Sequence, residues 1–169
     1  TVVEIALDAD GGFKVVSVDT AVDCGRVVNP EGVQQQVEGS AIFGLTLAMY
    51  GELTARDGKV EQSNFHNYRI MRINEAPAKI RAHIVDSDAP PSGIGEPPTP
   101  IIAPALAAAL HAASGQRFRN LPLLKAWQDW RKAQELGFDA VSAYGASGRY
   151  AGEMLSYDAL TNLVRDNYW

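Results

Sequence analysis

Residues 1–23, TVVEIALDADGGFKVVSVDTAVD, contain two β-rich runs on either side of the turn sequence DADGG. Asp and Gly are typical of tight turns, and apolar residues alternate with polar ones in both runs. This pattern predicts a β-hairpin. A second hairpin is predicted over residues 50–65, YGELTARDGKVEQSNF, around the turn RDGK, and a further strand over residues 78–88, AKIRAHIVDSD.

A helix is predicted between the first two of these hairpins, from Glu31 to about Met49. Apolar residues recur there at helical spacing, and Asn29-Pro30 supplies a capping residue followed by a proline that fits a first turn. Gly39 and Gly44 lie inside this segment, where small residues cost helix stability. They therefore indicate close approach by another backbone element or by a bulky ligand.

A second helix is predicted from Pro100 to Ala113, ending at Ser114-Gly115. The segment is apolar nearly all round, which predicts that the helix is buried. After residue 123 the hairpin pattern stops. A helix is predicted over 125–137 with Gly137 as its cap, a strand over 138–145 and a helix over 153–169. We therefore expect an α+β fold over residues 1–123, followed by an unassigned helix–strand–helix tail over 124–169.

The composition excludes several classes of protein. With 169 residues, 46% hydrophobic and 21% charged, the chain is of the soluble globular class. A net charge of −5 and the absence of a basic run argue against a nucleic-acid partner, and no apolar run reaches the length of a membrane span. The single cysteine, Cys24, is expected to be a small buried residue. It excludes an internal disulfide and an iron–sulfur site made by this chain alone.

The stretch SGIGEPPT, residues 92–99, places one carboxylate, Glu96, between two glycines and two prolines. Glycines let a backbone approach a ligand closely, and prolines fix the direction of the chain. A loop so strongly specified suggests a positioned functional group. An ordinary solvated glutamate is the alternative that the residues alone leave open.

Three stretches together resemble the C-terminal end of the molybdopterin-binding large subunit of the molybdenum hydroxylases, the xanthine dehydrogenase and aldehyde oxidase family. They are DCGRVVNPEGVQQQVEGSAIFGL, NFHNYRIMRINEAPAKIRAHIV and SGIGEPPTPIIAPALAAALHAASGQRFRNLPL, which lie within residues 1–123. The variant with EQSNFHNY and RINEAP looks most like the β subunit of bacterial isoquinoline 1-oxidoreductase-type enzymes. Residues 124–169 depart from the family pattern. The chain starts at TVVEIAL without an initiator methionine, so we expect a piece of a longer chain or a processed product.

The resemblance implies that Glu96 is the general base at the molybdenum centre. A general base needs a carboxylate within hydrogen-bond reach of the proton that it removes. The neighbouring Gly95 would let the backbone approach the cofactor, and Gly93 and Pro97 would shape the loop. The metal itself is expected to be held by the sulfur atoms of the pterin cofactor, so no protein metal ligand is expected. The three histidines are accordingly expected to be structural.

The resemblance further implies that Gln36 binds the pterin, since a primary amide can both donate and accept hydrogen bonds. Gln34 and Gln35 precede it directly and leave the register open. Gly39 would be the small neighbour that permits close approach, and Glu38 is expected to make a structural hydrogen bond.

The implied cofactor is molybdopterin with molybdenum, of which the cytosine dinucleotide is one form. The implied partners are the remainder of the large subunit, a small subunit that carries [2Fe-2S] clusters, and a small-molecule substrate. Relatives of this type occur in the bacterial cytoplasm and periplasm, and the residues do not choose between them. The function implied is oxidation of an aldehyde or an N-heterocycle with water as oxygen donor.

Two other functions stay open. The chain lacks most of the segments that build the family's cofactor cavity, so it could be an inactive fragment, or an assembly or binding module without the cofactor. A hydrolase that pairs Glu96 with Asp86 or Asp88 has less support, because these aspartates lie where solvated acids are expected and no second motif accompanies them.

Overall fold

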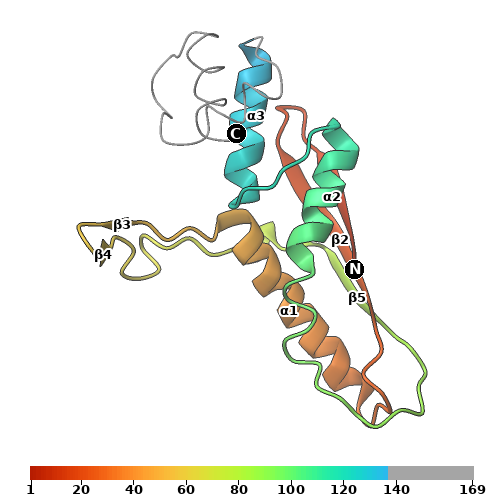
Figure 1. Cartoon of the computed structure of the whole chain (residues 1–169). Helices are drawn as coiled ribbons and strands as arrows, with labels where there is room; N and C mark the ends of the chain where they lie inside the picture. The colour runs from red at the N-terminus through yellow and green to blue at the C-terminus, as the bar shows by residue number, and fades with distance from the viewer. Residues whose placement is uncertain (137–169) are drawn as a thin grey trace, which may run out of the picture.

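The computed structural model describes residues 1–136 of the chain. The strand predicted over 138–145, the helix predicted over 153–169 and the cap predicted at residue 137 lie outside the described residues. Within them, the α+β prediction is confirmed: a small sheet is covered by helices, and a hairpin arm projects from the body (Figure 1).

The sheet has three strands in the order β1-β2-β5. Strands β1 (Val2–Leu7) and β2 (Phe13–Val22) form the predicted antiparallel hairpin. Strand β5 (Lys79–Ile84) pairs with β2 in parallel, although the two are far apart in sequence. A parallel pair needs a long crossover connection, and helix α1 and the arm supply it.

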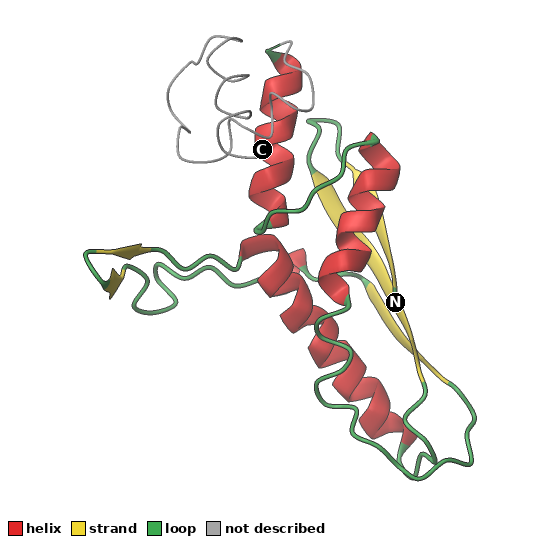
Figure 2. Ribbon diagram, viewed as in Figure 1, coloured by secondary structure: helices red, strands yellow, loops and turns green. Residues whose placement is uncertain are grey.

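Helix α1 (Pro30–Tyr50) starts where the sequence predicted, since the Asn29 side chain accepts a hydrogen bond of 3.1 Å from the Gly32 N–H. It packs against β5, and α2 (Ile102–Ser114) packs against β1 and α1. Helix α3 (Leu123–Glu135) lies near the C-terminal end of α1 (Figure 2).

One hydrophobic core joins the sheet to all three helices. Its buried members are Val3, Phe13, Val15, Val18, Ala41, Leu45, Ala48, Met49, Met71, Ile102, Leu106, Leu110, Phe118, Leu123 and Trp127. Helix α3 therefore contributes to the same core as the first part of the chain, although the sequence placed it beyond a boundary at residue 123. That boundary stays a prediction.

The prediction that the second helix is buried all round was wrong. Only Ile102, Leu106 and Leu110 of α2 are buried, one stripe at a spacing of four residues. Pro104, Ala108 and other small residues occupy the exposed side. Alanine contributes little apolar area, so its exposure costs little, and the apolar composition of this segment did not require a partner on every side.

The arm comprises residues 51–72 and carries the second predicted hairpin as two short strands, β3 (Ala55–Arg56) and β4 (Lys59–Val60). None of residues 51–70 is buried. The arm is held by its own polar contacts instead. The Gln62 side chain bonds both the backbone and the side chain of Thr54.

A polar cluster fixes the arm to α1 beside the 3₁₀ turn Ile73–Glu75. The Tyr50 hydroxyl donates to Glu75 at 3.0 Å, and Arg69 pairs with the same carboxylate while its guanidinium lies 4.4 Å from the Tyr50 ring centroid. Partial burial opposes the ionised form of Glu75, but the Arg72 backbone N–H, Tyr50 and Arg69 outweigh it and lower its pKa. The end of α1 and the return of the chain to the sheet are thereby joined.

Gly25 allows the chain after β2 to run beside the segment that follows β5. Its φ is +73°, and a Cβ atom there would lie 2.2 Å from the Pro90 carbonyl oxygen. Beside it, the Arg26 N–H donates to the Ala89 carbonyl oxygen at 2.9 Å. Only glycine meets both requirements, the left-handed backbone and the absent side chain.

We expect Gly25→Ala to lower the free energy of unfolding by about 1–3 kcal/mol more than the control Gly115→Ala, the usual cost of forcing an extra group into a packed site. Gly115 has an almost identical φ of +74° but nothing within 4 Å of a Cβ atom, so its substitution carries backbone strain alone, about 1–2 kcal/mol. Urea unfolding of both variants measures the difference. Equal costs would show that the Pro90 segment moves aside freely.

None of the helices within residues 1–136 has the length and apolar character needed to cross a membrane. Cys24 is buried, as predicted.

Candidate functional site

The loop that carries Glu96 is anchored upstream by a backbone bond and by apolar packing. The Ser92 N–H donates to the Cys24 carbonyl oxygen at 2.9 Å, just beyond the C-terminal end of β2. Two residues later, Ile94 packs against a small buried cluster that includes Val33 and Val37 of α1. This side of the loop is thus attached both to the segment that follows β2 and to α1.

The loop is anchored again just downstream of Glu96. The Pro98 side chain is fully buried, and the Thr99 N–H donates to the Glu96 carbonyl oxygen at 2.9 Å. A Cβ atom at Gly44 of α1 would lie 2.7 Å from the Thr99 carbonyl oxygen and 2.8 Å from Ile102 Cβ. The interpretation of Gly44 as a point of close backbone approach is therefore confirmed.

The structure brings Gln36, Gly95 and Glu96 together. The Ser40 hydroxyl donates to the Gly95 carbonyl oxygen at 3.2 Å, and Gln36 Oε1 lies 3.5 Å from the position that a Cβ atom on Gly95 would take. Both the Glu96 and the Gln36 side chains are exposed, and neither has a hydrogen-bond partner within residues 1–136. The loop that carries the unpaired Glu96 carboxylate thus lies against the middle of α1, beside the unpaired amide of Gln36.

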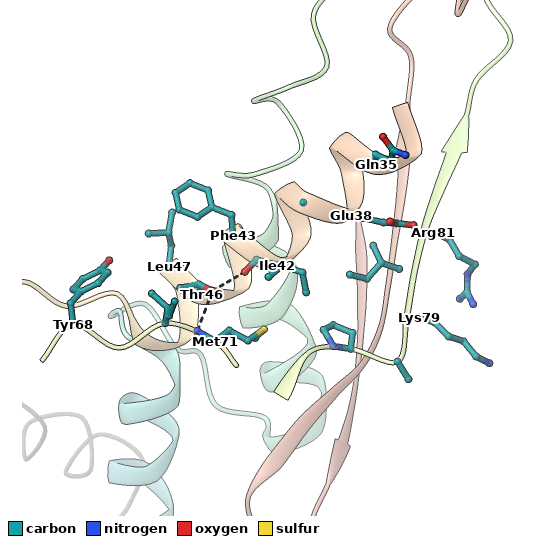
Figure 3. A pocket seen from close by; sticks show the side chains of 15 residues that line it. Gln35, Glu38, Ile42, Phe43, Thr46, Leu47, Tyr68, Met71, Lys79 and Arg81 are labelled. Atoms are coloured by element: carbon teal, nitrogen blue, oxygen red, sulfur yellow. Dashed lines mark hydrogen bonds between the residues drawn. The ribbon is translucent and has the colours of Figure 1, made fainter. Parts of the chain in front are cut away.

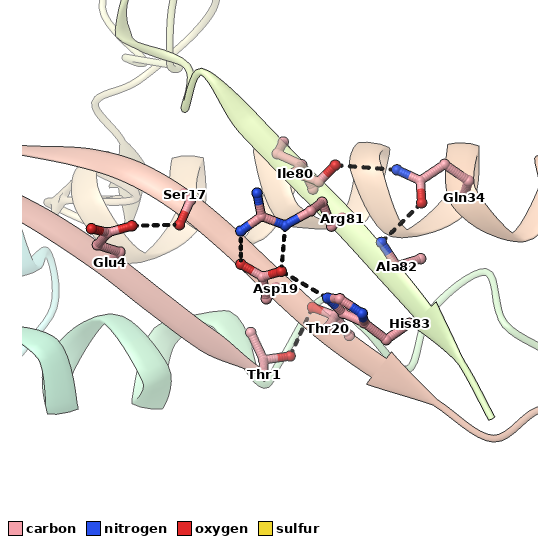
Figure 4. A network of polar contacts seen from close by, with 10 residues as sticks. All are labelled: Thr1, Glu4, Ser17, Asp19, Thr20, Gln34, Ile80, Arg81, Ala82 and His83. Atoms are coloured by element: carbon pink, nitrogen blue, oxygen red, sulfur yellow. Dashed lines mark hydrogen bonds and ion pairs between the residues drawn. The ribbon is translucent and has the colours of Figure 1, made fainter.

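The three consecutive glutamines of α1 have different surroundings. The Gln34 carboxamide donates to the Ile80 carbonyl oxygen at 3.2 Å and accepts from the Ala82 N–H at 2.9 Å (Figure 4). It takes the place of a neighbouring strand along β5, which is an edge strand. Gln35 lines a groove on another side of α1. Only Gln36 adjoins the Glu96 loop, which was not visible in the sequence QQQ.

Glu38 accepts a hydrogen bond of 2.6 Å from Gln34, so the hydrogen bond expected of it is present. Gly39 is exposed, and a Cβ atom there would have nothing within 4 Å. No described residue therefore requires glycine at position 39, and its predicted contact with the pterin stays a prediction.

A groove of about 1060 Å³ lies between α1 and the chain that returns from the arm (Figure 3). Ile42 and Phe43 line it from α1, and Met71 and Pro77 face them from the returning chain. Phe43 is 58% exposed, which is unusual for a side chain of this size. The surface is apolar, with Lys79 and Arg81 at its rim.

A network of charged side chains links β2 to β5. Asp19 of β2 receives two hydrogen bonds of 2.6 Å from Arg81 and one contact of 2.7 Å from His83, both on β5 (Figure 4). Hydrogen bonds from Arg81 and then His83 hold the pKa of Asp19 well below its usual range. The parallel register places Asp19 opposite Arg81, so the network ties the two strands together.

Residues 1–136 contain neither a metal-ligand group nor the carboxylate pair considered for a hydrolase. No group of three or more His, Cys, Asp or Glu side chains within residues 1–136 is arranged to hold a metal ion. Asp88 forms an exposed ion pair of 3.7 Å with Arg26, and no contact between Glu96 and Asp86 or Asp88 is present in this part of the chain. The geometry therefore offers no support for a carboxylate-pair hydrolase.

Residues 1–77 match the family model described as molybdopterin cofactor-binding domain. The isoquinoline 1-oxidoreductase subunit beta of Brevundimonas diminuta is 31% identical over 125 residues, 74% of this chain and 16% of that protein. The membrane-bound aldehyde dehydrogenase (pyrroloquinoline-quinone) of Gluconacetobacter polyoxogenes is 33% identical over 102 residues, 60% of this chain and 13% of that protein. The chain thus spans about a sixth or less of the length of these relatives.

The fold is also found among solved structures. Quinoline 2-oxidoreductase from Pseudomonas putida 86 matches with a TM-score of 0.62 over 70% of this chain and 16% of that chain, at 21% sequence identity. At this level of identity the likeness concerns the fold alone.

Proposed function

Because this chain belongs to the molybdopterin cofactor-binding family that includes xanthine dehydrogenase and aldehyde oxidase, we propose that it is part of a molybdenum hydroxylase. The enzyme would oxidise an aldehyde or an N-heterocycle with water as oxygen donor. In this proposal Glu96 is the general base, and Gln36, Gly39 and Gly95 lie at the cofactor. The observation that carries the proposal is the loop anchored on both sides of a free Glu96, directly beside the free amide of Gln36.

The residues present fit a pterin cofactor. The Gln36 amide offers a donor and an acceptor with no partner of their own among residues 1–136, and the space beside Gly39 and Gly93 is open. When bound, molybdopterin with molybdenum supplies the two-electron acceptor for the oxidation.

The chain's own contribution is to place a base. Glu96 accepts the proton of the water-derived nucleophile, and the anchors at Ile94 and Pro98 keep its backbone from moving away from the reacting atoms. Because its side chain is exposed in this chain, further protein must enclose it to keep water from competing. We propose the remainder of the large subunit for that part of the wall.

The apolar groove along α1 supports the same partner. An exposed apolar surface of this kind is typical of a protein interface, and covering the Phe43 side chain would remove apolar area from water.

The electrons would leave through [2Fe-2S] clusters on a separate small subunit, since one cysteine cannot hold a cluster. The cytosine dinucleotide form of the cofactor is part of this proposal. The groove alone also suits the alternative, an assembly module without cofactor.

The test is metal analysis of the native protein together with the masses of all chains that co-purify. We expect molybdenum, a larger chain and an iron–sulfur subunit. Gln36→Ala should then lose the cofactor about fivefold faster during dialysis, because one hydrogen bond contributes about 1 kcal/mol to binding. The neighbouring variant Gln35→Ala should lose it at the wild-type rate. A lone chain of 18.2 kDa without molybdenum would favour the assembly module.

A further inference from the structure

We propose that Ser40 is a positioning residue, which aims Glu96 by holding the peptide group that precedes it. The inference rests on the proposed role of Glu96 as general base. Ser40 is a small polar residue in the middle of α1, and nothing in its sequence context, VEGSAIF, distinguishes it from a packing residue.

The contact is specific to this loop. The Ser40 side chain is only 6% exposed, and its hydroxyl donates to the Gly95 carbonyl oxygen at 3.2 Å. Within residues 1–136 it is the only side-chain hydrogen bond from α1 to residues 92–99. The remaining anchors of the loop are backbone bonds and apolar packing at Ile94 and Pro98.

Those anchors fix where the loop lies but not how the peptide at residue 95 is turned. Glycine has the widest backbone freedom of any residue, so the peptide plane after Gly95 could rotate between the two packed positions. That plane contains both the Gly95 carbonyl and the Glu96 nitrogen, because the peptide bond is planar. A bond that fixes the carbonyl therefore also fixes the Glu96 nitrogen and Cα, the atoms from which the Glu96 side chain is directed.

The experiment compares Ser40→Ala and Ser40→Thr with the control Thr46→Val in the full enzyme that contains this chain. Thr46 lies on the same helix and is equally buried at 6%, but its hydroxyl donates to the Ile42 carbonyl oxygen at 2.9 Å and accepts from the Met71 N–H at 3.4 Å, so neither partner lies in residues 92–99. Alanine favours the helix more than serine does, so Ser40→Ala should fold. Ser40→Thr retains the hydroxyl.

Hydrogen exchange of the peptide that covers residues 92–99 gives a readout independent of turnover. We expect the hydrogen-bonded amides of Ser92 and Thr99 to exchange about fivefold faster in Ser40→Ala than in the wild type. This factor corresponds to the loss of one hydrogen bond of about 1 kcal/mol. The value of kcat should fall by about the same factor with KM unchanged. Thr46→Val should change neither, and Ser40→Thr should restore both.

Unchanged exchange in Ser40→Ala would overturn the proposal, because the hydroxyl would not then hold the loop. Faster exchange with an unchanged kcat would overturn it too, since the loop would be held without aiming the base. The proposed function is tested separately by Glu96→Gln. If this variant retained its turnover, Glu96 would not be the general base. The exchange data would still report whether Ser40 holds the loop.

Discussion

Glutamine in place of Glu96 is expected to lower the turnover of the assembled enzyme about 100- to 10,000-fold, the usual contribution of a positioned general base. Glutamine has nearly the same shape but cannot accept the proton. The loop should survive the change, because its anchors at Ser92, Ile94 and Pro98 do not involve the Glu96 side chain. Molybdenum content should therefore stay the same, which separates lost chemistry from lost cofactor.

The measurement is steady-state turnover together with metal analysis of the same preparation. Glu31→Gln is a matched control, because Glu31 is also an exposed glutamate but lies in the first turn of α1, where it has no hydrogen bond to the loop. We expect it to behave as the wild type. Turnover within a few fold of wild type in Glu96→Gln would show that the base is another group.

Trp127→Ala is expected to lower the free energy of unfolding by about 3–5 kcal/mol, the cost of removing a large buried aromatic side chain. Trp127 is 3% exposed and packs edge-on against Phe13 at a centroid distance of 5.6 Å. Phe118 and Trp130 also contact its ring. The indole N–H donates to the Gly11 carbonyl oxygen at 2.9 Å, so the same side chain holds the turn between β1 and β2.

Urea unfolding followed by circular dichroism measures this cost. Trp127→Phe keeps most of the packing and removes only the bond to Gly11, so it should cost about 1 kcal/mol. Trp130→Ala should cost less than Trp127→Ala, because Trp130 is only partly buried. If Trp127→Ala cost no more than a surface substitution, within about 0.5 kcal/mol, helix α3 would not be part of the main core.

The elements with local signals were predictable from the sequence. Asn29-Pro30 marks the start of α1, DADGG the first turn and Gly115 the end of α2, because each depends on a few neighbouring residues. The parallel pairing of β5 with β2 was not predictable, since it joins residues about 60 positions apart. The packing of α3 was not predictable either. Its sequence pattern indicated a helix, but not the contact of Trp127 with Phe13.

The sequence predicted which residues form the candidate site, but not how they lie relative to one another. Glu96 and Gln36 were predicted from the family resemblance, and the run of three consecutive glutamines left the register of Gln36 open. The choice depends on β5, whose edge takes up the Gln34 carboxamide. Ser40 carried no signal, because a buried serine on a helix resembles many others until its acceptor is known.

The arm lies within the connection between β2 and β5, and this gives the fold an unusual tolerance of length. Closing a flexible loop costs entropy that grows only with the logarithm of its length, so doubling the loop adds about 0.6 kcal/mol. None of residues 51–70 is buried, and the cluster around Glu75 closes the arm at its base. Insertions or deletions near the tip at Asp57-Gly58 would therefore leave the sheet and the Glu96 loop intact. Evolution could alter what the arm touches without altering what the loop does.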